Sequence, residues 1–258
     1  MIICVDVGNT TIGVGLYQND KMIRSLSFTT DLMKTSDEFE SIILNKIKEK
    51  GTTDPNEVVY IVYSSVVPEI NLALKDALLR VFNHAHIMSI TPGIKTGLLI
   101  KVDNPLEIGN DLIADLVGAK ERYGYPLLIA DLGTASKLLL IDKSGAFSSA
   151  LIIPGLSLSA ASLSYKASLL PTVALDVPKS VLAKNTIDAM NAGIIYGHAE
   201  MINGLVNRIE KEIGYPCKHI LTGGSSFLIK DILKDDFIYH KDLVLDGLYT
   251  LYLKNRGQ

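Results

Sequence analysis

Cysteine is scarce in this chain of 258 residues, which carries only Cys4 and Cys217. The two are far apart, and no cluster of histidines accompanies either of them in the sequence. Zinc and iron–sulfur sites need several such ligands at close spacing, so the sequence predicts neither kind of site. We expect two buried thiols in the reducing environment of the cytosol.

Long basic runs and long apolar runs are also missing. The 25 basic and 28 acidic residues give a net charge of −3 without a block of one sign, which disfavours a nucleic-acid partner. No apolar run has the length that a bilayer requires, and the first residues lack the basic stretch of a signal peptide. With 48% hydrophobic and 21% charged residues, the composition is that of a globular protein, which we expect to be cytoplasmic.

The same order of elements occurs twice in the sequence. Each copy has a buried strand, a turn that begins Asp-x-Gly, a second strand, a polar turn and a third strand. The strands are expected at residues 2–5, 11–17 and 22–28 in the first copy and at 127–130, 136–141 and 146–153 in the second. Asp6 and Asp131 are 131 − 6 = 125 residues apart, about half the chain length, which indicates duplication of a whole lobe.

Helical and strand patterns alternate after each copy, which favours a mixed α/β fold for both lobes. Thr35 and Glu38 have capping-box spacing at the start of a helix that we expect to end at about Lys50. Further helices are expected at 68–81, 109–123, 187–213 and 244–253, and further strands at 58–63 and 218–221. We expect an N-terminal lobe at residues 1–108 and a C-terminal lobe at residues 109–258.

The two Asp-x-Gly turns are candidate phosphate-binding segments. Glycine lets backbone N–H groups approach a phosphate, hydroxyl and amide groups donate to its oxygens, and a carboxylate can hold a metal ion. A single Asp-x-Gly turn is often only a hairpin connection, but its repetition favours phosphate binding by two turns that face each other across a cleft. The residues concerned are Asp6, Gly8, Asn9, Thr10 and Thr11 in the first turn and Asp131, Gly133 and Thr134 in the second.

Two further segments carry candidate residues. Thr222, Gly223 and Gly224 follow another buried strand, and we expect their backbone to approach the nucleoside. Asp111 lies early in an expected helix, where an acid that complements the helix dipole is as good an explanation as a catalytic carboxylate.

Taken together, these segments resemble the type III pantothenate kinases, and the resemblance extends over nearly the whole chain. No single motif is specific, but their order and spacing are. The shared motifs are Asp6-Val7-Gly8-Asn9-Thr10, Thr35-Ser36-Asp37-Glu38, Ser64-Ser65-Val66-Val67-Pro68, Asn104-Pro105 with Gly109 and Asp111, Asp131-Leu132-Gly133-Thr134-Ala135, Ile153-Pro154-Gly155, Leu170-Pro171, Lys184-Asn185-Thr186 and Thr222-Gly223-Gly224.

The resemblance implies duplicated ribonuclease H-like lobes of the actin-like (ASKHA) type, each a mixed sheet flanked by helices. It implies transfer of a phosphoryl group from ATP to the primary hydroxyl of pantothenate, which is the first step of coenzyme A biosynthesis. It also implies that the reaction uses Mg²⁺ and a monovalent cation (K⁺ or NH₄⁺). It also implies a homodimer whose dimer-forming helices lie in the C-terminal lobe. In these terms Asp111 is the general base, Asp6 serves the metal and phosphates, and Asp131 holds the monovalent cation.

Several residues depart from the family pattern. At the pantothenate side, Val102 replaces a tyrosine, Leu112 an arginine and Ala167 a threonine. Gly109 is retained beside them, and Asn110 occupies the place of an alanine. Losing an arginine that pairs with a carboxylate removes a contact worth about 1.5–3 kcal/mol. Nearer the phosphates, Lys137 replaces a second threonine and Ser148-Ser149 replaces paired glycines. Lys137 is either a cation beside the phosphates or a solvated strand residue.

The departures leave alternatives open. One is a nucleotide-binding, catalytically impaired paralogue that acts as a regulatory or partner subunit, including as the partner of an active homologue in a heterodimer. Another is a kinase for a different, less polar acceptor. Val102, Leu112 and Ala167 favour these alternatives, whereas the retained Asp6, Asp111 and Asp131 favour pantothenate phosphorylation. A hydrolase of the exopolyphosphatase type has no support beyond the shared turns.

Overall fold

Two compact units make up the protein. The computed structural model describes residues 1–48, 54–167, 169–233 and 236–257. The first unit comprises Met1–Gly97, Asn104–Gly118 and Asp242–Gln258, and the second comprises Leu98–Asp103 and Ala119–Lys241. The expected single boundary after residue 108 divides the chain differently, because helix α6 (Leu243–Asn255) returns to the first unit and packs against its strands β1, β2 and β4.

The first unit is built on a five-stranded mixed sheet. Its order is β3-β2-β1-β4-β5, formed by Ile2–Val7 (β1), Thr11–Gln18 (β2), Lys21–Thr29 (β3), Tyr60–Ser65 (β4) and His86–Ser89 (β5). The central strand β1 pairs antiparallel with β2 and parallel with β4. A central strand is covered on both faces, which explains its nearly continuous apolar sequence.

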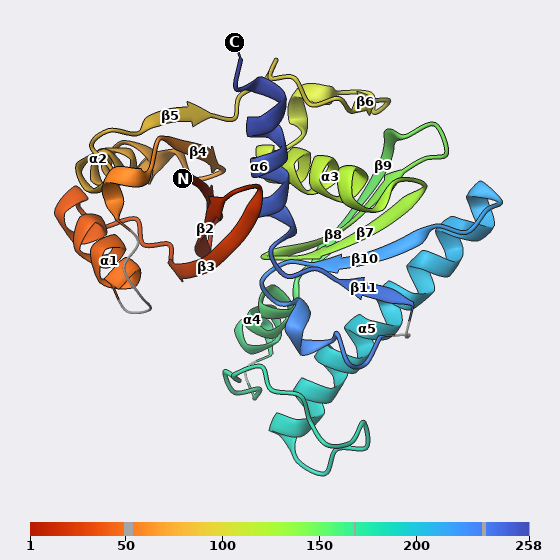
Figure 1. Cartoon of the computed structure of the whole chain (residues 1–258). Helices are drawn as coiled ribbons and strands as arrows, with labels where there is room; N and C mark the ends of the chain where they lie inside the picture. The colour runs from red at the N-terminus through yellow and green to blue at the C-terminus, as the bar shows by residue number, and fades with distance from the viewer. Residues whose placement is uncertain (49–53, 168, 234–235, 258) are drawn as a thin grey trace. The chain divides into compact units, whose positions relative to one another are not determined.

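Helices cover both faces of the first sheet (Figure 1). On one face, α1 (Ser36–Lys48) and α2 (Asn71–Val81) share a core with every second residue of β1, namely Ile3, Val5 and Val7. On the other face lies α6, where Tyr17 stacks on Tyr249 with ring centroids 4.3 Å apart. Because side chains alternate along a strand, the buried Cys4 faces α6.

The second unit repeats the topology of the first. Its sheet has the order β11-β10-β7-β8-β9-β6, formed by Leu99–Ile100 (β6), Leu127–Leu132 (β7), Ala135–Ile141 (β8), Ala146–Pro154 (β9), Lys218–Thr222 (β10) and Phe237–Tyr239 (β11). The strand β7 pairs antiparallel with β8 and parallel with β10, as β1 does with β2 and β4. Strand for strand, the series β9-β8-β7-β10-β11 matches β3-β2-β1-β4-β5, so the expected duplication is present.

Two helices pack on one face of the second sheet. They are α4 (Leu156–Lys166) and the long α5 (Thr186–Ile213), which runs as the cyan helix in Figure 1. Their apolar residues, including Leu156, Ile195 and Ile202, share a core with Leu128, Ala130 and Leu132 of β7 among others. Asn185 caps α5 by accepting a hydrogen bond of 2.9 Å from the backbone N–H of Asp188, which explains why the helix begins at Thr186.

The remaining elements are one helix shared by the two units and several single turns of helix. Helix α3 (Asn110–Tyr123) begins in the first unit, and its last residues, 119–123, belong to the second. Single turns of 3₁₀ helix occur at Pro55–Glu57, Pro68–Ile70, Pro105–Glu107 and Ser226–Leu228. Among the described residues, no helix is long and apolar enough to cross a membrane.

Most expected elements are present with small shifts at their ends. The capping box at Thr35 and Glu38 is formed, with the Thr35 N–H donating to the Glu38 carboxylate at 2.9 Å. The helix after it is described to Lys48, and its expected end near Lys50 lies outside the described residues. The main difference is that Asp6 and Asp131 belong to the strands rather than to the turns, because ladder pairing continues through both residues.

Both cysteines are free thiols, one in each unit. Cys4 is fully buried, as expected, whereas Cys217 is only partly buried. Burial, with a smaller contribution from the nearby Glu210 carboxylate, raises the pKa of Cys217 to about 11.

Candidate functional site

The turn after β1 is fixed by backbone hydrogen bonds. The Gly8 N–H donates to the carbonyl oxygen of Thr11 at 3.1 Å, and the Thr30 N–H donates to that of Thr10 at 3.0 Å. The Thr30 hydroxyl also donates to the Gly8 carbonyl oxygen at 2.6 Å. Asn9, Thr10 and Thr11 are exposed. The turn is therefore held by the end of β3 while its polar side chains remain accessible.

Asp6 faces the α6 side of the first sheet. It lies opposite Gly13 in the antiparallel pair of β1 and β2, and a Cβ added to Gly13 would lie 3.8 Å from Leu245 of α6. Residues directly opposite each other in such a pair share one face of the sheet. The carboxylate of Asp6 therefore leaves β1 on the same side as Cys4, away from the core formed with α1 and α2.

Asp111 stands in the first turn of α3 and is partly buried. Its carboxylate folds back over Gly109, where an added Cβ would clash with Oδ1. The side-chain amide of Asn110 donates to the carbonyl oxygen of Ile90 at 3.0 Å, which ties the start of the helix to the segment after β5. Asn110, expected at the substrate, thus holds the backbone next to Asp111.

In the second unit, three of the sequence motifs meet at the end of β7. The N–H of Ser225 donates to the carbonyl oxygen of Leu132 at 2.8 Å. Gly223 has a φ of +92°, and a Cβ there would lie 2.5 Å from Oδ1 of Asp131. A Cβ at Gly155 would lie 2.5 Å from the carbonyl oxygen of Gly133 and would clash with that of Thr134. Both glycines are required because backbones pass in direct contact.

The candidate residues at this place differ in exposure. Asp131 and Thr222 are buried, at 8% and 2% exposure, whereas Thr134 and Gly224 are exposed. A Cβ added to Gly224 would meet no heavy atom of the described residues within 4 Å. Open space above glycine backbone is what a bound phosphate or nucleoside needs.

Lys137 forms an ion pair with Asp131. Its Nζ lies 3.0 Å from Oδ2, and the two side chains are only 18% and 12% exposed. The two residues lie opposite each other in the antiparallel pair of β7 and β8. Of the two sequence interpretations of Lys137, this geometry rules out the solvated strand residue.

The expected site residues divide between the units. The first unit holds Asp6, Gly8, Asn9, Thr10, Thr11, Gly109, Asn110, Asp111 and Leu112, and the second holds Val102, Asp131, Gly133, Thr134, Ala167, Thr222, Gly223 and Gly224. Val102 follows β6, and Ala167 is the C-cap of α4. Among the described residues, no group of three or more His, Cys, Asp or Glu side chains is placed to hold a metal ion.

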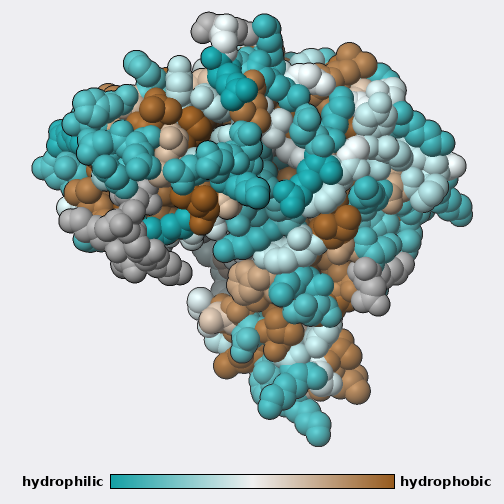
Figure 2. All heavy atoms as spheres, in the orientation of Figure 1, coloured by the Kyte–Doolittle hydropathy of each residue, from teal (hydrophilic) through white to brown (hydrophobic). Residues whose placement is uncertain are grey.

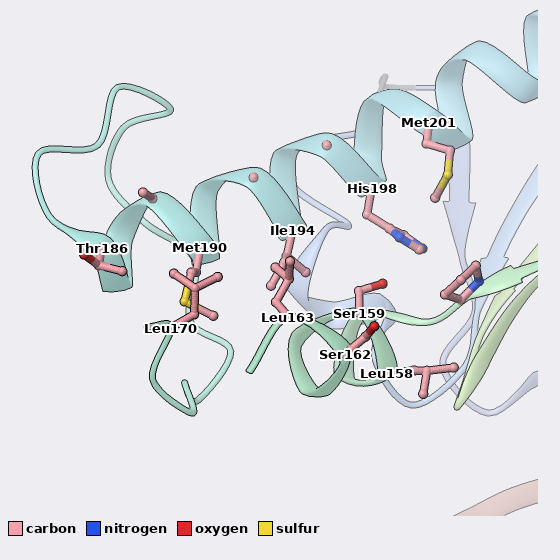
Figure 3. Close-up of a pocket in the computed structure, with 14 residues that line it drawn as sticks. Leu158, Ser159, Ser162, Leu163, Leu170, Thr186, Met190, Ile194, His198 and Met201 are labelled. Atoms are coloured by element: carbon pink, nitrogen blue, oxygen red, sulfur yellow. The ribbon is translucent and has the colours of Figure 1, made fainter. Parts of the chain in front are cut away.

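A pocket that the sequence did not predict lies between α4 and α5. Its volume is about 860 Å³, and Figure 3 shows Ile194 and His198 projecting from α5 toward α4. Gly193 and Gly197 also line it, and within the part of the chain that the structure describes, an added Cβ at either would meet no heavy atom within 4 Å. The sequence feature that could have indicated this pocket is the pair of glycines four residues apart on the long helix.

His198 is a buried polar residue in the lining of this pocket. It is 4% exposed, and its Nε2 lies 2.9 Å from Oγ of Ser136 on β8. Burial lowers the pKa of His198 because the charged ring loses its hydration. The imidazole is therefore neutral at physiological pH and links α5 to the strand that carries Lys137.

Two solved structures are similar to the chain as a whole. A conserved protein assigned to the Baf family of transcriptional activators from Campylobacter jejuni has a TM-score of 0.60 at 16% identity, over 99% of this chain and 100% of that one. Component A of (R)-2-hydroxyglutaryl-CoA dehydratase from Acidaminococcus fermentans has a TM-score of 0.56 at 15% identity, over 98% of each chain. At these identities the likeness shows the fold alone. It confirms the expected fold class of duplicated actin-like lobes, each a mixed sheet flanked by helices.

The sequence comparisons are more specific. The type III pantothenate kinase of Listeria monocytogenes serotype 4a (strain HCC23) is 38% identical over 256 residues, which cover 99% of this chain and 98% of that protein. A match to the family of type III pantothenate kinases extends over residues 2–208. The resemblance noted from the motifs is thus confirmed, and the chain belongs to the type III pantothenate kinase family of phosphotransferases.

Proposed function

We propose that this protein phosphorylates pantothenate with ATP to give 4'-phosphopantothenate, the first step of coenzyme A biosynthesis. The observation that carries the proposal is the equivalence of Asp6 and Asp131. Each is the next-to-last residue of the central strand of one unit, and each is followed by a glycine-containing turn with hydroxyl side chains. Each turn offers backbone N–H and hydroxyl donors to phosphoryl oxygens, and family membership supplies the substrates.

Asp111 is the proposed general base. A primary hydroxyl is a poor nucleophile, and a placed carboxylate can accept its proton while the phosphoryl group is transferred in line. The contact with Gly109 and the Asn110 bond to Ile90 restrict where the carboxylate of Asp111 can lie. Such restriction is what a positioned base requires.

Asp6 is the proposed residue for Mg²⁺. This ion keeps several waters and binds through one or two carboxylates together with substrate phosphates, so a single carboxylate beside a phosphate turn fits it. Mg²⁺ would neutralise charge that develops on the phosphoryl group. The second turn is different, because Lys137 already supplies a positive charge to Asp131, where the resemblance implies K⁺ or NH₄⁺.

The test is ADP formation by the purified protein with ATP and Mg²⁺, in the presence and absence of pantothenate, with the product identified by mass. Replacing Asp111 with Asn should reduce kcat roughly 10²- to 10⁴-fold, because proton removal is lost. The matched control is Asp37→Asn, which removes an exposed first-turn acid of α1. Pantothenate-independent ADP formation, or equal loss in both variants, would contradict the proposal.

A second candidate function rests on the residues expected to bind pantothenate, the phosphoryl acceptor. Val102 and Leu112 are apolar and partly buried where the family has polar side chains, so neither can bind a carboxylate. These residues suit a less polar acceptor, or a partner subunit that binds nucleotide without transferring phosphate. ADP binding without pantothenate-dependent turnover would favour this candidate.

For the quaternary structure we propose a homodimer through α4 and α5. Leu158, Leu163 and Ile187 are 40–53% exposed there, and Gly193 and Gly197 leave room for close approach of another helix. Figure 2 shows hydrophobic residues at the surface of this part of the second unit, at the bottom of the view. A second copy of the chain is the proposed occupant of the pocket described above.

The dimer is tested by sedimentation velocity. Gly193→Leu places a large side chain in the open space and should shift the protein to monomers, whereas Gly204→Leu, on the same helix outside the pocket, should not. A monomeric wild-type protein at micromolar concentration would contradict the proposal. A heterodimer with a homologue would appear only after the homologue is added.

A further inference from the structure

The Asp131 carboxylate has a close neighbour at each of its oxygens. Oδ2 receives the Lys137 ammonium at 3.0 Å, and Oδ1 lies against the backbone of Gly223, where a Cβ would come within 2.5 Å. Asp131 also lies opposite Thr222 in the parallel pair of β7 and β10. The strands β7, β8 and β10 therefore meet at this carboxylate. The positive charge beside it is supplied by the side chain of Lys137.

Lys137 is placed by the strand ladder rather than by chance orientation. Its partner is its direct neighbour in the antiparallel pair of β7 and β8, one pair away from the end of the ladder at the turn. Neighbouring side chains in such a pair point to the same side of the sheet. The ammonium thus stays beside Asp131, on the strand that follows the Gly133-Thr134 turn.

A second ion pair in the same unit provides a comparison. Lys101 Nζ also lies 3.0 Å from an aspartate oxygen, that of Asp142, but the Lys101 side chain is 45% exposed. Lys137 is 18% exposed and its partner carboxylate 12% exposed. A pair shielded from water interacts more strongly than a solvated one, because water screens the attraction less.

These contacts disfavour a monovalent cation from solution on Asp131. A dehydrated K⁺ needs several oxygen ligands, and one carboxylate oxygen already carries an ammonium while the other abuts a glycine backbone. A second positive charge at this distance from the ammonium would be repelled. The residues at this place do not fit the K⁺ or NH₄⁺ that the family resemblance implies.

We propose that the Lys137 ammonium takes the place of a monovalent cation at Asp131, so that nucleotide binding by this protein does not depend on K⁺ or NH₄⁺. The proposal rests on the proposed function in one respect, namely that a nucleotide phosphate binds at the turn after β7. A tethered cation needs no recruitment from solution, and its three N–H donors can serve Asp131 and a phosphate together.

The first experiment measures ADP binding to the full chain by calorimetry, in KCl and in choline chloride at the same ionic strength of about 0.15 M. For the wild type, the two Kd values should agree within about twofold. Lys137→Thr replaces the ammonium by a hydroxyl, which suits a strand and can bind a cation. This variant should bind ADP about tenfold more weakly in choline, and KCl should restore binding.

Lys101→Thr is the matched control, because it removes the exposed lysine of the other 3.0 Å pair in the same unit. Its ADP affinity should equal that of the wild type in both salts. A wild-type protein that binds ADP about tenfold more tightly in KCl than in choline would overturn the proposal. So would a folded Lys137→Thr variant that KCl does not rescue.

A second measurement needs no nucleotide. KCl in place of choline should raise the melting temperature of Lys137→Thr by roughly 2 °C and leave that of the wild type unchanged. A K⁺-induced rise in the wild type would mean that Asp131 still binds a cation, which contradicts the proposal whether or not the variant folds. Absence of pantothenate-dependent turnover would count against the proposed function and leave both of these results interpretable.

Discussion

Gly118 of α3 and Gly247 of α6 touch backbone to backbone. A Cβ added to Gly118 would lie 2.9 Å from both the N and the Cα atoms of Gly247, and one added to Gly247 would clash with the carbonyl of Ala114. The two helices cross at this contact inside the first unit. Since α3 carries Asp111 at its start, the contact fixes the helix that presents the proposed base.

Replacing Gly247 with Ala should therefore destabilise the protein by about 1–3 kcal/mol, because overpacking against a backbone carbonyl forces the helices apart. Urea unfolding followed by circular dichroism measures the change. Gly204→Ala is the control, since Gly204 is an exposed helix residue whose added Cβ would meet nothing within 4 Å. It should stabilise the protein by up to about 1 kcal/mol, and equal effects in the two variants would contradict the packing argument.

Gly109→Ala should impair catalysis more than folding. The added Cβ would clash with Oδ1 of Asp111, so the carboxylate must leave its place, and kcat should fall by about 10²-fold while KM for ATP changes little. Steady-state kinetics with pantothenate provides the measurement. An unchanged kcat in a variant that folds would show that the position of this carboxylate is not needed.

Gly224→Ala probes how closely the nucleotide approaches the turn after β10. The protein has room for the methyl group, so the free energy of unfolding should change by less than about 0.5 kcal/mol. If the backbone lies against the nucleoside as proposed, ADP affinity should fall about tenfold. Unchanged affinity would remove Gly224 from the nucleotide site.

Protonation of His198 should lower stability at acidic pH. Burial lowers its pKa in the folded protein, so below about pH 6.5 the unfolded chain takes up a proton that the folded protein does not. The free energy of unfolding should therefore decrease as pH falls below that value, with a slope from this residue of at most about 1.4 kcal/mol per pH unit. Urea titrations at several pH values measure the slope.

His198→Asn should flatten this pH dependence, because the titrating ring is gone. His84→Asn removes an exposed histidine and should leave the slope as it is in the wild type. If His198→Asn kept the wild-type slope, another group would have to be responsible.

The duplicated strands could be predicted because strong local signals mark them. Apolar runs end in Asp-x-Gly at Asp6 and Asp131, and capping residues such as Thr35 and Asn185 mark helix starts. The ends of these strands could be predicted less accurately than their presence. Backbone pairing does not depend on side-chain polarity, so β1 and β7 continue through their aspartates.

Other parts of the structure had no usable signal in the sequence. Helix α4 has the sequence LSLSAASLSYK, in which serines break the amphipathic pattern, and the edge strands β5, β6 and β11 have only two to four residues. The Lys137–Asp131 pair depends on strand register, which a hydrophobic pattern alone does not give. The α6 packing could not be predicted because it joins residues more than two hundred positions apart, such as Tyr17 and Asp246.

The distribution of the two cysteines gives each unit its own chemical reporter. Cys4 lies in the centre of the first sheet, while Cys217 stands just before β10 in the second unit. Only a thiolate reacts with alkylating reagents, and a side chain without solvent exposure must first become accessible through local opening. The rate of Cys4 modification, compared with that of Cys217, therefore measures how often the first unit opens, and a ligand that binds there would slow Cys4 selectively.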